Sequence, residues 1–379
     1  MTRLNLELNG PERAVNFAQG FPDFPTDSRI LEAAARALRD GYNQYATTWG
    51  APQLRAAVAR KQSAAWGRGV DAETEVTISC GATEAMIAAM LAAVDPGDEV
   101  IIFEPFYENY GPDCIISGAV PRFVSLCAPD WSFDPDELRR AFNRKTRAIV
   151  VNTPQNPTGK VYSRQELELI AGLCVEHDAI AITDEIYEHL VYRGRHISLA
   201  TLPGMAERTI TISGASKTFS VTGWRIGWLV APPPLTAGIR KVHDFLTVGA
   251  AHPLQIAIAA ALELPPSFYT ELLGDYRERR DVIASGLQDC GFDAPAPDGA
   301  YYVMAGIRSA GGRARAGGSS LDDTAMARHL IEKAAVATVP ASSFYHDPNL
   351  GRGHLRFSFP KRIETIERGL RALRAMQAD

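Results

Sequence analysis

The feature that most constrains the fold is a regular alternation of short β-rich runs with helical segments between residues 75 and 230. Many of the β-rich runs are apolar at consecutive positions, so both faces of each strand must be covered. Helices that connect consecutive strands provide this cover in a mostly parallel sheet. The runs that predict strands are Glu75–Ser79, Glu99–Phe103, Arg122–Leu126, Ala148–Asn152, Ala179–Thr183, Thr209–Ser213 and Ile226–Val230. We therefore predict an α/β fold with a mostly parallel seven-stranded sheet flanked by helices.

The length of 379 residues suggests more than one folding unit. We assign residues 41–275 to a large α/β domain that contains the sheet. Residues 1–40 and 276–379, from both ends of the chain, are assigned to a smaller α+β domain. The segment 306–320 is dense in Gly, Ala, Ser and Arg, so we expect a flexible, solvated loop there.

Charge and hydropathy exclude several classes of protein. The chain has 39 Lys and Arg against 44 Asp and Glu, a net charge of −5 without clustered basic residues, so we expect no nucleic-acid partner. No run of eighteen uncharged apolar residues occurs, and the first residues lack the apolar core of a signal peptide, so we expect no membrane span. Five widely spaced cysteines without a CxxC pair are typical of a reducing compartment. The expected location is the cytoplasm.

Polar residues gather where the predicted strands end. In parallel α/β sheets this edge is where ligands bind. The polar segments that follow the strands are Gly81-Ala82-Thr83, Glu104–Tyr107, Asn152–Gly159, Asp184 with Tyr187, and Ser213–Lys217 with Arg225. We therefore expect the functional site at this edge.

A candidate anion site lies at Gly81-Ala82-Thr83, where free backbone N–H groups and a hydroxyl begin a helix. Ser216 and Arg225 add a hydroxyl and a guanidinium, and the whole set is suited to a dianionic phosphate. An ordinary helix cap has the same sequence signature, so the turn alone leaves both interpretations open.

Two charged residues at strand ends indicate catalytic chemistry. Lys217 stands among small residues, where desolvation would lower its pKa and make it a Schiff-base nucleophile; the alternative is a surface lysine. Asp184 follows an apolar strand, and a buried carboxylate there could hold a protonated pyridine nitrogen; the alternative is a structural Asp–Arg pair. Tyr107 is suited to stacking on a planar ring, with a core aromatic as the alternative.

Glu185, Glu188 and His189 resemble a carboxylate and histidine metal cluster. They lie around a strand-to-helix junction and lack the HExxH spacing of a metal-binding helix. We therefore predict no metal site.

Segments along most of the chain resemble the signatures of class I pyridoxal-phosphate aminotransferases of fold type I. They include NTPQNPTGKV from residue 152, ITDEIY from 182, SGASKTFSVTGWRIGW from 213 and HLRFSF from 354. QGFPDFPTD from residue 19, NQYATTWGAPQLR from 43 and EPFYENY from 104 support them. The resemblance spans residues 16 to about 370, and the chain is most similar to the kynurenine/glutamine transaminase branch.

The resemblance implies a role for each matching residue. Lys217 would form a Schiff base with pyridoxal 5'-phosphate, and Asp184 would pair with its pyridine nitrogen. The other implied cofactor contacts are Asn156 and Tyr187 at the phenolic oxygen, Tyr107 on the ring, and Ala82, Thr83, Ser216 and Arg225 at the phosphate. Arg356, Asn156 and the backbone of Gly20 would bind the substrate carboxylate. Tyr45 would reach the phosphate of a neighbouring subunit, which implies a homodimer with shared active sites.

The implied reaction moves the amino group of an L-amino acid to a 2-oxo acid in two ping-pong half-reactions. Departures from the family pattern concern the phosphate site and the substrate. Gly214 stands where many relatives place a phosphate-binding serine, the arm before Asn16 is short, and residues 247–249 lack the aromatic side chains of kynurenine transaminases. We therefore expect an aromatic, sulfur-containing or glutamine-like donor. A pyridoxal-phosphate-dependent β-lyase or cyclase, and a non-catalytic cofactor-binding regulator, stay open as alternatives.

Overall fold

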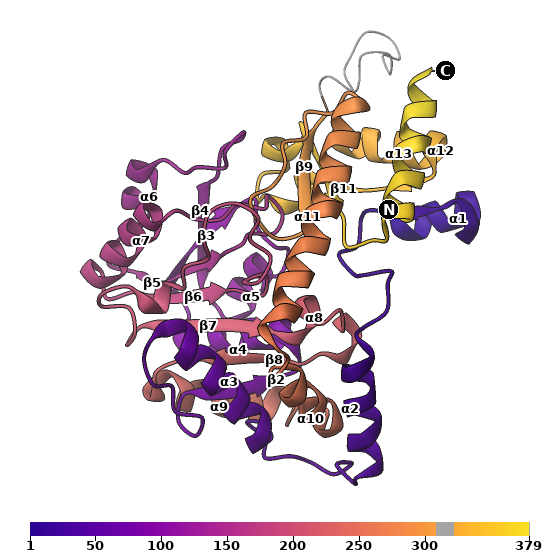
Figure 1. Ribbon diagram of the computed structural model, residues 1–379. Helices are drawn as coiled ribbons and strands as arrows, with labels where there is room; N and C mark the ends of the chain where they lie inside the picture. The colour runs from indigo at the N-terminus through magenta and orange to yellow at the C-terminus, as the bar shows by residue number, and fades with distance from the viewer. Residues whose placement is uncertain (308–321, 379) are drawn as a thin grey trace.

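The computed structural model describes residues 1–307 and 322–378 (Figure 1). Most of the loop expected at residues 306–320 therefore lies outside the described residues. The chain forms a large part around a seven-stranded sheet and a smaller part around two short sheets.

The large sheet has the strand order β2-β8-β7-β6-β5-β3-β4. Its strands are β2 (Val76–Ser79), β3 (Glu99–Glu104), β4 (Val120–Ser125), β5 (Thr146–Asn152), β6 (Ile180–Asp184), β7 (Thr209–Gly214) and β8 (Gly227–Val230). Neighbouring strands are parallel except that β8 runs antiparallel to β2 and to β7. The predicted α/β class and the mostly parallel seven-stranded sheet are thus confirmed.

Both faces of this sheet are covered, as its apolar strands require. On β3 and β5, Ile102 and Val150 pack in a core cluster with α4 (Gly81–Ala93) and α9 (Pro233–Leu246). Their neighbours Ile101 and Ile149 point the other way, into a cluster with α7 (Arg164–Glu176). The helices α5 (Tyr110–Ile116) and α6 (Pro135–Ala141) complete these two layers. The sheet is therefore buried on both sides, and polar groups can gather only at its ends.

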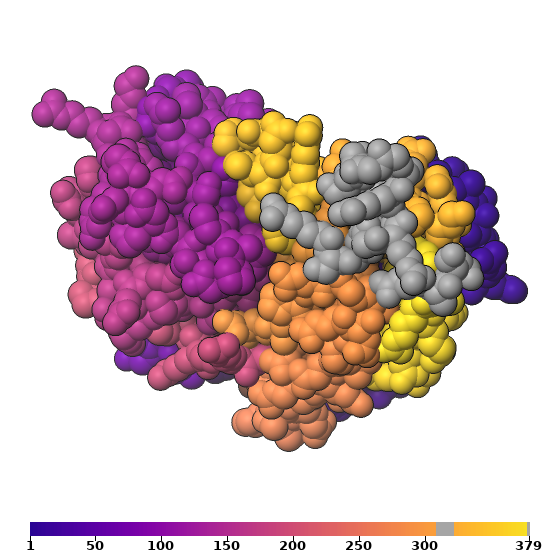
Figure 2. Space-filling model, turned by 90° about the horizontal axis from the view of Figure 1, so that it is seen from above, coloured from indigo at the N-terminus to yellow at the C-terminus, as the bar shows by residue number. Residues whose placement is uncertain are grey.

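The smaller part combines segments from both ends of the chain (Figures 1 and 2). Strands β9 (Tyr302–Gly306), β12 (His354–Ser358) and β11 (Val339–Pro340) form an antiparallel sheet, and β1 (Val15–Asn16) pairs in parallel with β10 (Val336–Ala337). Its helices are α1 (Thr2–Arg13), α12 (Asp323–Ala334) and α13 (Ile363–Ala378). Figure 2 shows the indigo N-terminal and yellow C-terminal segments on the same side of the molecule.

Helices near the predicted domain boundaries pack against neighbours on both sides of them. α2 (Ser28–Arg39) packs on α10 (His252–Ala261), and α10 also contacts α3 (Pro52–Trp66). The long α11 (Pro266–Asp289) spans residues 275 and 276, and it packs against α13. The division into residues 41–275 and the two chain ends stays a proposal.

Candidate active site

The predicted residues meet in one cavity at the carboxyl ends of the central strands. Nine of the ten predicted cofactor-binding residues line it: Ala82, Thr83, Tyr107, Asn156, Asp184, Tyr187, Ser216, Lys217 and Arg225. Met86, Asn109, Tyr110, Asn152, Ile186 and Tyr302 complete the lining. An adjoining depression holds Gly20 and Arg356 and shares Tyr107, Asn156, Lys217 and Tyr302 with the cavity. The predicted cofactor and substrate contacts are therefore neighbours.

Lys217 lies in the short helix α8 (Ala215–Thr218), directly after β7. Its Nζ donates a hydrogen bond to the carbonyl oxygen of Gly20 at 3.1 Å and lies 5.5 Å from the ring centre of Tyr301. Burial, with the nearby charges of Arg225 and Arg356, lowers the pKa of Lys217 to about 8. A larger fraction of this amine is therefore neutral and nucleophilic near neutral pH than in an exposed lysine.

We expect the pKa of Lys217 to set the pH dependence of cofactor capture. Because the neutral amine is the nucleophile, its fraction rises about tenfold per pH unit below the pKa and levels off above it. The rate at which cofactor-free protein binds pyridoxal phosphate, followed by visible absorption in stopped flow, should therefore rise with pH and level off near 8. A rate that keeps rising to pH 10 would contradict this expectation.

Asp184 is the last residue of β6, buried at the floor of the cavity. Its Oδ2 accepts a hydrogen bond from Tyr110 Oη at 2.7 Å, and its Oδ1 accepts one from the backbone N–H of Ile186 at 3.2 Å. Burial raises the pKa of Asp184, although these hydrogen bonds and Lys217 oppose the effect. No arginine pairs with Asp184 within the described chain. A buried carboxylate in this situation is suited to a cationic ligand group.

Tyr187 and Asn156 face the same cavity from the loops after β6 and β5. The hydroxyls of Tyr187 and Tyr302 are 2.8 Å apart. Asn156 Oδ1 accepts a hydrogen bond from Nη1 of Arg356 at 2.9 Å, so one amide lies between the two cavities.

Arg356, on β12, is buried with part of its hydrogen-bonding capacity free. Its Nη2 donates to the carbonyl oxygen of Ala18 at 2.8 Å, and the guanidinium lies between the rings of Tyr302 and Phe344, 4.5 and 4.7 Å from their centres. Nε has no partner within the described chain. Because a buried donor without an acceptor is costly, the site is suited to a carboxylate ligand.

The anion site at the start of α4 is built around two glycines. Gly81 has φ +79°, and an added Cβ there would lie 2.4 Å from Nη2 of Arg225. A Cβ on Gly227 would lie 2.5 Å from the backbone of Gly81. The guanidinium of Arg225 can therefore reach the helix start, where its Nη2 donates to Oγ1 of Thr83 at 3.2 Å. This cradle of N–H groups, hydroxyl and guanidinium fits a phosphate.

Tyr45 lies outside both cavities of this chain, and 88% of its surface is exposed. This placement leaves it free to contact another molecule, and its predicted role in a neighbouring subunit stays a proposal.

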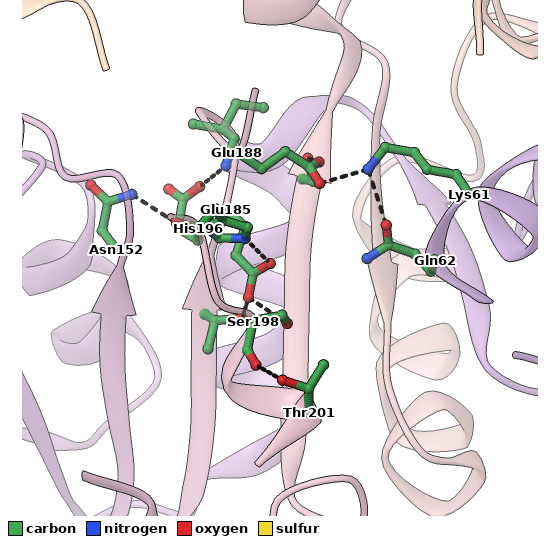
Figure 3. A network of polar contacts seen from close by, with 12 residues as sticks. Lys61, Gln62, Asn152, Glu185, Glu188, His196, Ser198 and Thr201 are labelled. Atoms are coloured by element: carbon green, nitrogen blue, oxygen red, sulfur yellow. Dashed lines mark hydrogen bonds and ion pairs between the residues drawn. The ribbon is translucent and has the colours of Figure 1, made fainter. Parts of the chain in front are cut away.

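Of the cluster of Glu185, Glu188 and His189, the two carboxylates anchor the chain to neighbouring elements (Figure 3). Glu188 pairs with Lys61 at 2.7 Å and accepts a hydrogen bond from Ser213 at 2.8 Å. Glu185 pairs with His196 at 2.9 Å and accepts from Ser198 at 2.8 Å. No group of three metal-binding side chains occurs within residues 1–307 and 322–378. The contacts tie the segment between Asp184 and Tyr187 to its surroundings.

Polar cavity residues to which the sequence assigned no role include Tyr110, Asn152 and Tyr302. Tyr110 stands three residues after Tyr107, on the next turn of chain, and Asn152 is the last residue of a predicted strand. Their positions beside predicted site residues were the sequence signals that could have identified them. Tyr302 lies in a strand of the smaller part, so its approach depends on how the two parts pack.

A lysine with a lowered pKa, a buried carboxylate and a cradle of N–H groups lie together at the end of a seven-stranded α/β sheet. This arrangement fits pyridoxal phosphate in an enzyme of fold type I. The residues present fit this cofactor group by group. The model for aminotransferase class I and II matches residues 12–373. The chain belongs to this family, and it is a pyridoxal-phosphate-dependent transaminase, as the resemblance implied.

Several proteins are similar along nearly the whole chain. A probable N-succinyldiaminopimelate aminotransferase DapC from Mycobacterium tuberculosis is 42% identical, covering 95% of this chain and 91% of its own. Kynurenine–oxoglutarate transaminase 3 from Mus musculus is 37% identical, covering 97% and 86%. The solved N-succinyldiaminopimelate aminotransferase from Mycobacterium tuberculosis superposes with a TM-score of 0.93 at 40% identity, covering 99% of this chain and 96% of that one.

Proposed function

We propose that this transaminase accepts an L-amino acid with an aromatic, sulfur-containing or glutamine-like side chain, and that Lys217 is its catalytic base and Schiff-base nucleophile. The observation that carries the residue assignment is the buried Nζ of Lys217, with its pKa of about 8, in the cavity that Asp184, Tyr187 and Arg225 line. Bound pyridoxal phosphate supplies an electron sink for negative charge on the substrate Cα.

The chain's own groups prepare and carry the proton transfer. Asp184 holds the positive charge of the pyridine nitrogen, and Tyr187 and Asn156 donate to the phenolic oxygen. The neutral Nζ of Lys217 would accept the proton from the substrate Cα and hold it for return, which is the role of a general base. Thr83, Ser216, Arg225 and the N–H of Ala82 hold the phosphate, and Tyr107 covers the ring.

Arg356 is the proposed carboxylate receptor, so changing its fork should affect substrate binding most. Lysine keeps the charge but loses the two-pronged geometry. A hydrogen bond to a charged group contributes about 1.5–3 kcal/mol. Because the variant loses such a bond, we expect Arg356→Lys to raise KM for the amino donor about 10- to 100-fold. Steady-state kinetics measures it, with Arg279→Lys, which lies outside both cavities, as the matched control. Equal KM values in the two variants would refute the role of Arg356.

The depression around Arg356 supports a donor with an uncharged side chain. Tyr107, Tyr302, Val339 and Met1 contribute aromatic and apolar surface, and Glu108 contributes an acidic group. Apart from Lys217 and Arg356, no cationic side chain lines it within the described chain. A second carboxylate on the donor would thus lack a partner there and would face Glu108.

The proposal is tested by the visible spectrum of the purified protein with single amino acids. Methionine, glutamine, phenylalanine and kynurenine should bleach the band of bound cofactor faster than aspartate, and 2-oxo acid should form without ammonia. Preferred bleaching by aspartate would refute the proposed donor class. Ammonia release from an amino acid that carries a leaving group on Cβ would instead indicate a β-lyase, and a band that no donor changes would indicate a regulator. N-succinyldiaminopimelate belongs in the panel because a relative is named for it.

We also propose that the protein is a homodimer located in the cytoplasm. Tyr45 and Phe245 have 88% and 93% of their surfaces exposed, and Leu246 and Val248 are exposed as well. His252 contacts the segment of Tyr45, with its Nδ1 3.0 Å from the carbonyl oxygen of Gln44. Exposed apolar side chains of this kind favour a protein partner, and sedimentation at the monomer mass would exclude the dimer. No helix within residues 1–307 and 322–378 has the length and apolar content of a membrane span.

A further inference from the structure

A buried ion pair lies directly behind the helix start that we assign to the cofactor phosphate. Glu84 belongs to the first turn of α4, and His243 belongs to α9; their side chains are 7% and 1% exposed. Nδ1 of His243 lies 2.6 Å from Oε1 of Glu84, and Nε2 lies 2.7 Å from the carbonyl oxygen of Thr48. Neither side chain lines the cofactor cavity.

The hydrogen-bond partners determine the charge of both groups. The carbonyl of Thr48 can only accept, so Nε2 of His243 carries a proton. Glu84 accepts hydrogen bonds from the backbone N–H of Cys80 on one oxygen and from Oγ1 of Thr247 on the other, the second at 2.8 Å, which favours its carboxylate form. Beside a carboxylate, Nδ1 of His243 donates as well, and the ring is an imidazolium.

The pKa directions agree with this assignment. Burial opposes the charged form of Glu84, but its hydrogen bonds, that of His243 foremost, lower its pKa overall. Burial likewise opposes the charge of His243, and Glu84 raises the pKa of the ring overall.

A carboxylate at this place is a problem for phosphate binding. Through the N–H of Cys80, Glu84 holds the residue that precedes Gly81-Ala82-Thr83, the proposed phosphate turn. A lone negative charge in the first turn would offset the partial positive charge of the helix start and repel a dianion. The hydrogen bond to Cys80 is useful for shaping the turn, because the Cys80 side chain makes no cap.

We propose that His243 is a positioning residue for the cofactor phosphate: its positive charge neutralises Glu84, so that the carboxylate can shape the start of α4 without weakening the attraction for the dianion. The inference rests on the proposed placement of the phosphate at Thr83 and Arg225. Glu84 shapes the start of α4, and the positive charge of His243 offsets the repulsion between Glu84 and the phosphate.

The test compares the full-length His243→Gln, Glu84→Gln and Glu84→Gln/His243→Gln proteins with the wild type. The Kd of each is measured for pyridoxal phosphate and for phosphate-free pyridoxal by equilibrium dialysis and absorption. We expect His243→Gln to weaken pyridoxal phosphate binding about tenfold, since it leaves Glu84 uncompensated within one helix turn. Pyridoxal binding should change less, and the double variant should recover most of the loss. His346→Gln, which removes a similar pair with Glu104, should change neither Kd.

The outcomes separate the inference from the site assignment. A double variant as weak as His243→Gln, or an equal loss for both ligands, would overturn the inference. Should His243→Gln fail to fold, Glu84→Gln alone decides: its preference for pyridoxal phosphate over pyridoxal should stay at the wild-type value or rise, and a tenfold fall would overturn the inference. Arg225→Gln tests the placement itself, because an unchanged preference for pyridoxal phosphate over pyridoxal in this variant would refute the assigned phosphate site and, with it, the premise of the inference.

Discussion

Lys217→Ala should abolish transamination while leaving the fold intact. The variant lacks both the amine that attaches the cofactor covalently and the base at the substrate Cα, so we expect kcat to fall by about 10⁴-fold or more. Burial lowers the pKa of Lys217 to about 8, so its protonated form at neutral pH lowers the free energy of unfolding. The melting temperature of the cofactor-free variant should therefore equal or exceed that of the wild type.

Lys361 provides a matched control for this variant. It too is buried, and burial lowers its pKa to about 8, but its Nζ donates to the carbonyl oxygens of Gln19 and Phe21 outside the cofactor cavity. Lys361→Met should keep the cofactor bound through a borohydride-reducible linkage, and Lys217→Ala should lose this linkage. A reducible linkage in Lys217→Ala, or transamination at the wild-type rate, would refute the assignment of Lys217.

The large sheet was predictable because each strand carries its own signal. Runs such as Ala148–Asn152 are apolar at consecutive positions, and turn residues such as Pro96 and Gly97 separate them from the helices. Strand β8 was predicted as a strand, but its antiparallel direction was not. Direction depends on where the connecting chain crosses the sheet, and no local pattern of residues 226–230 encodes it.

The site was predictable where its residues follow strands of the large sheet, as Asp184 and Lys217 do. The contributions of Tyr302 and Tyr110 depend on how segments pack in three dimensions, which no local sequence pattern encodes. Tyr302 reaches Tyr187 from the smaller part, 115 positions along the chain. Glu84 pairs with His243 across 159 positions, and only packing of α4 on α9 brings them together. Local patterns identify strand ends, and tertiary contacts decide which side chains meet there.

Asp184→Asn should have the second largest effect, because the amide cannot hold the positive charge of the pyridine nitrogen. Removing one partner of a buried ion pair costs about 3–5 kcal/mol, which corresponds to a fall in kcat/KM of about 10²- to 10⁴-fold. Asp113→Asn is the matched control: Asp113 is a second buried carboxylate, on α5, whose pKa burial raises to about 6, and it lies outside the cavity. Steady-state kinetics should show near-normal kcat/KM for Asp113→Asn. If both variants lost activity equally, the effect would reflect general damage to the core, and the role assigned to Asp184 would be wrong.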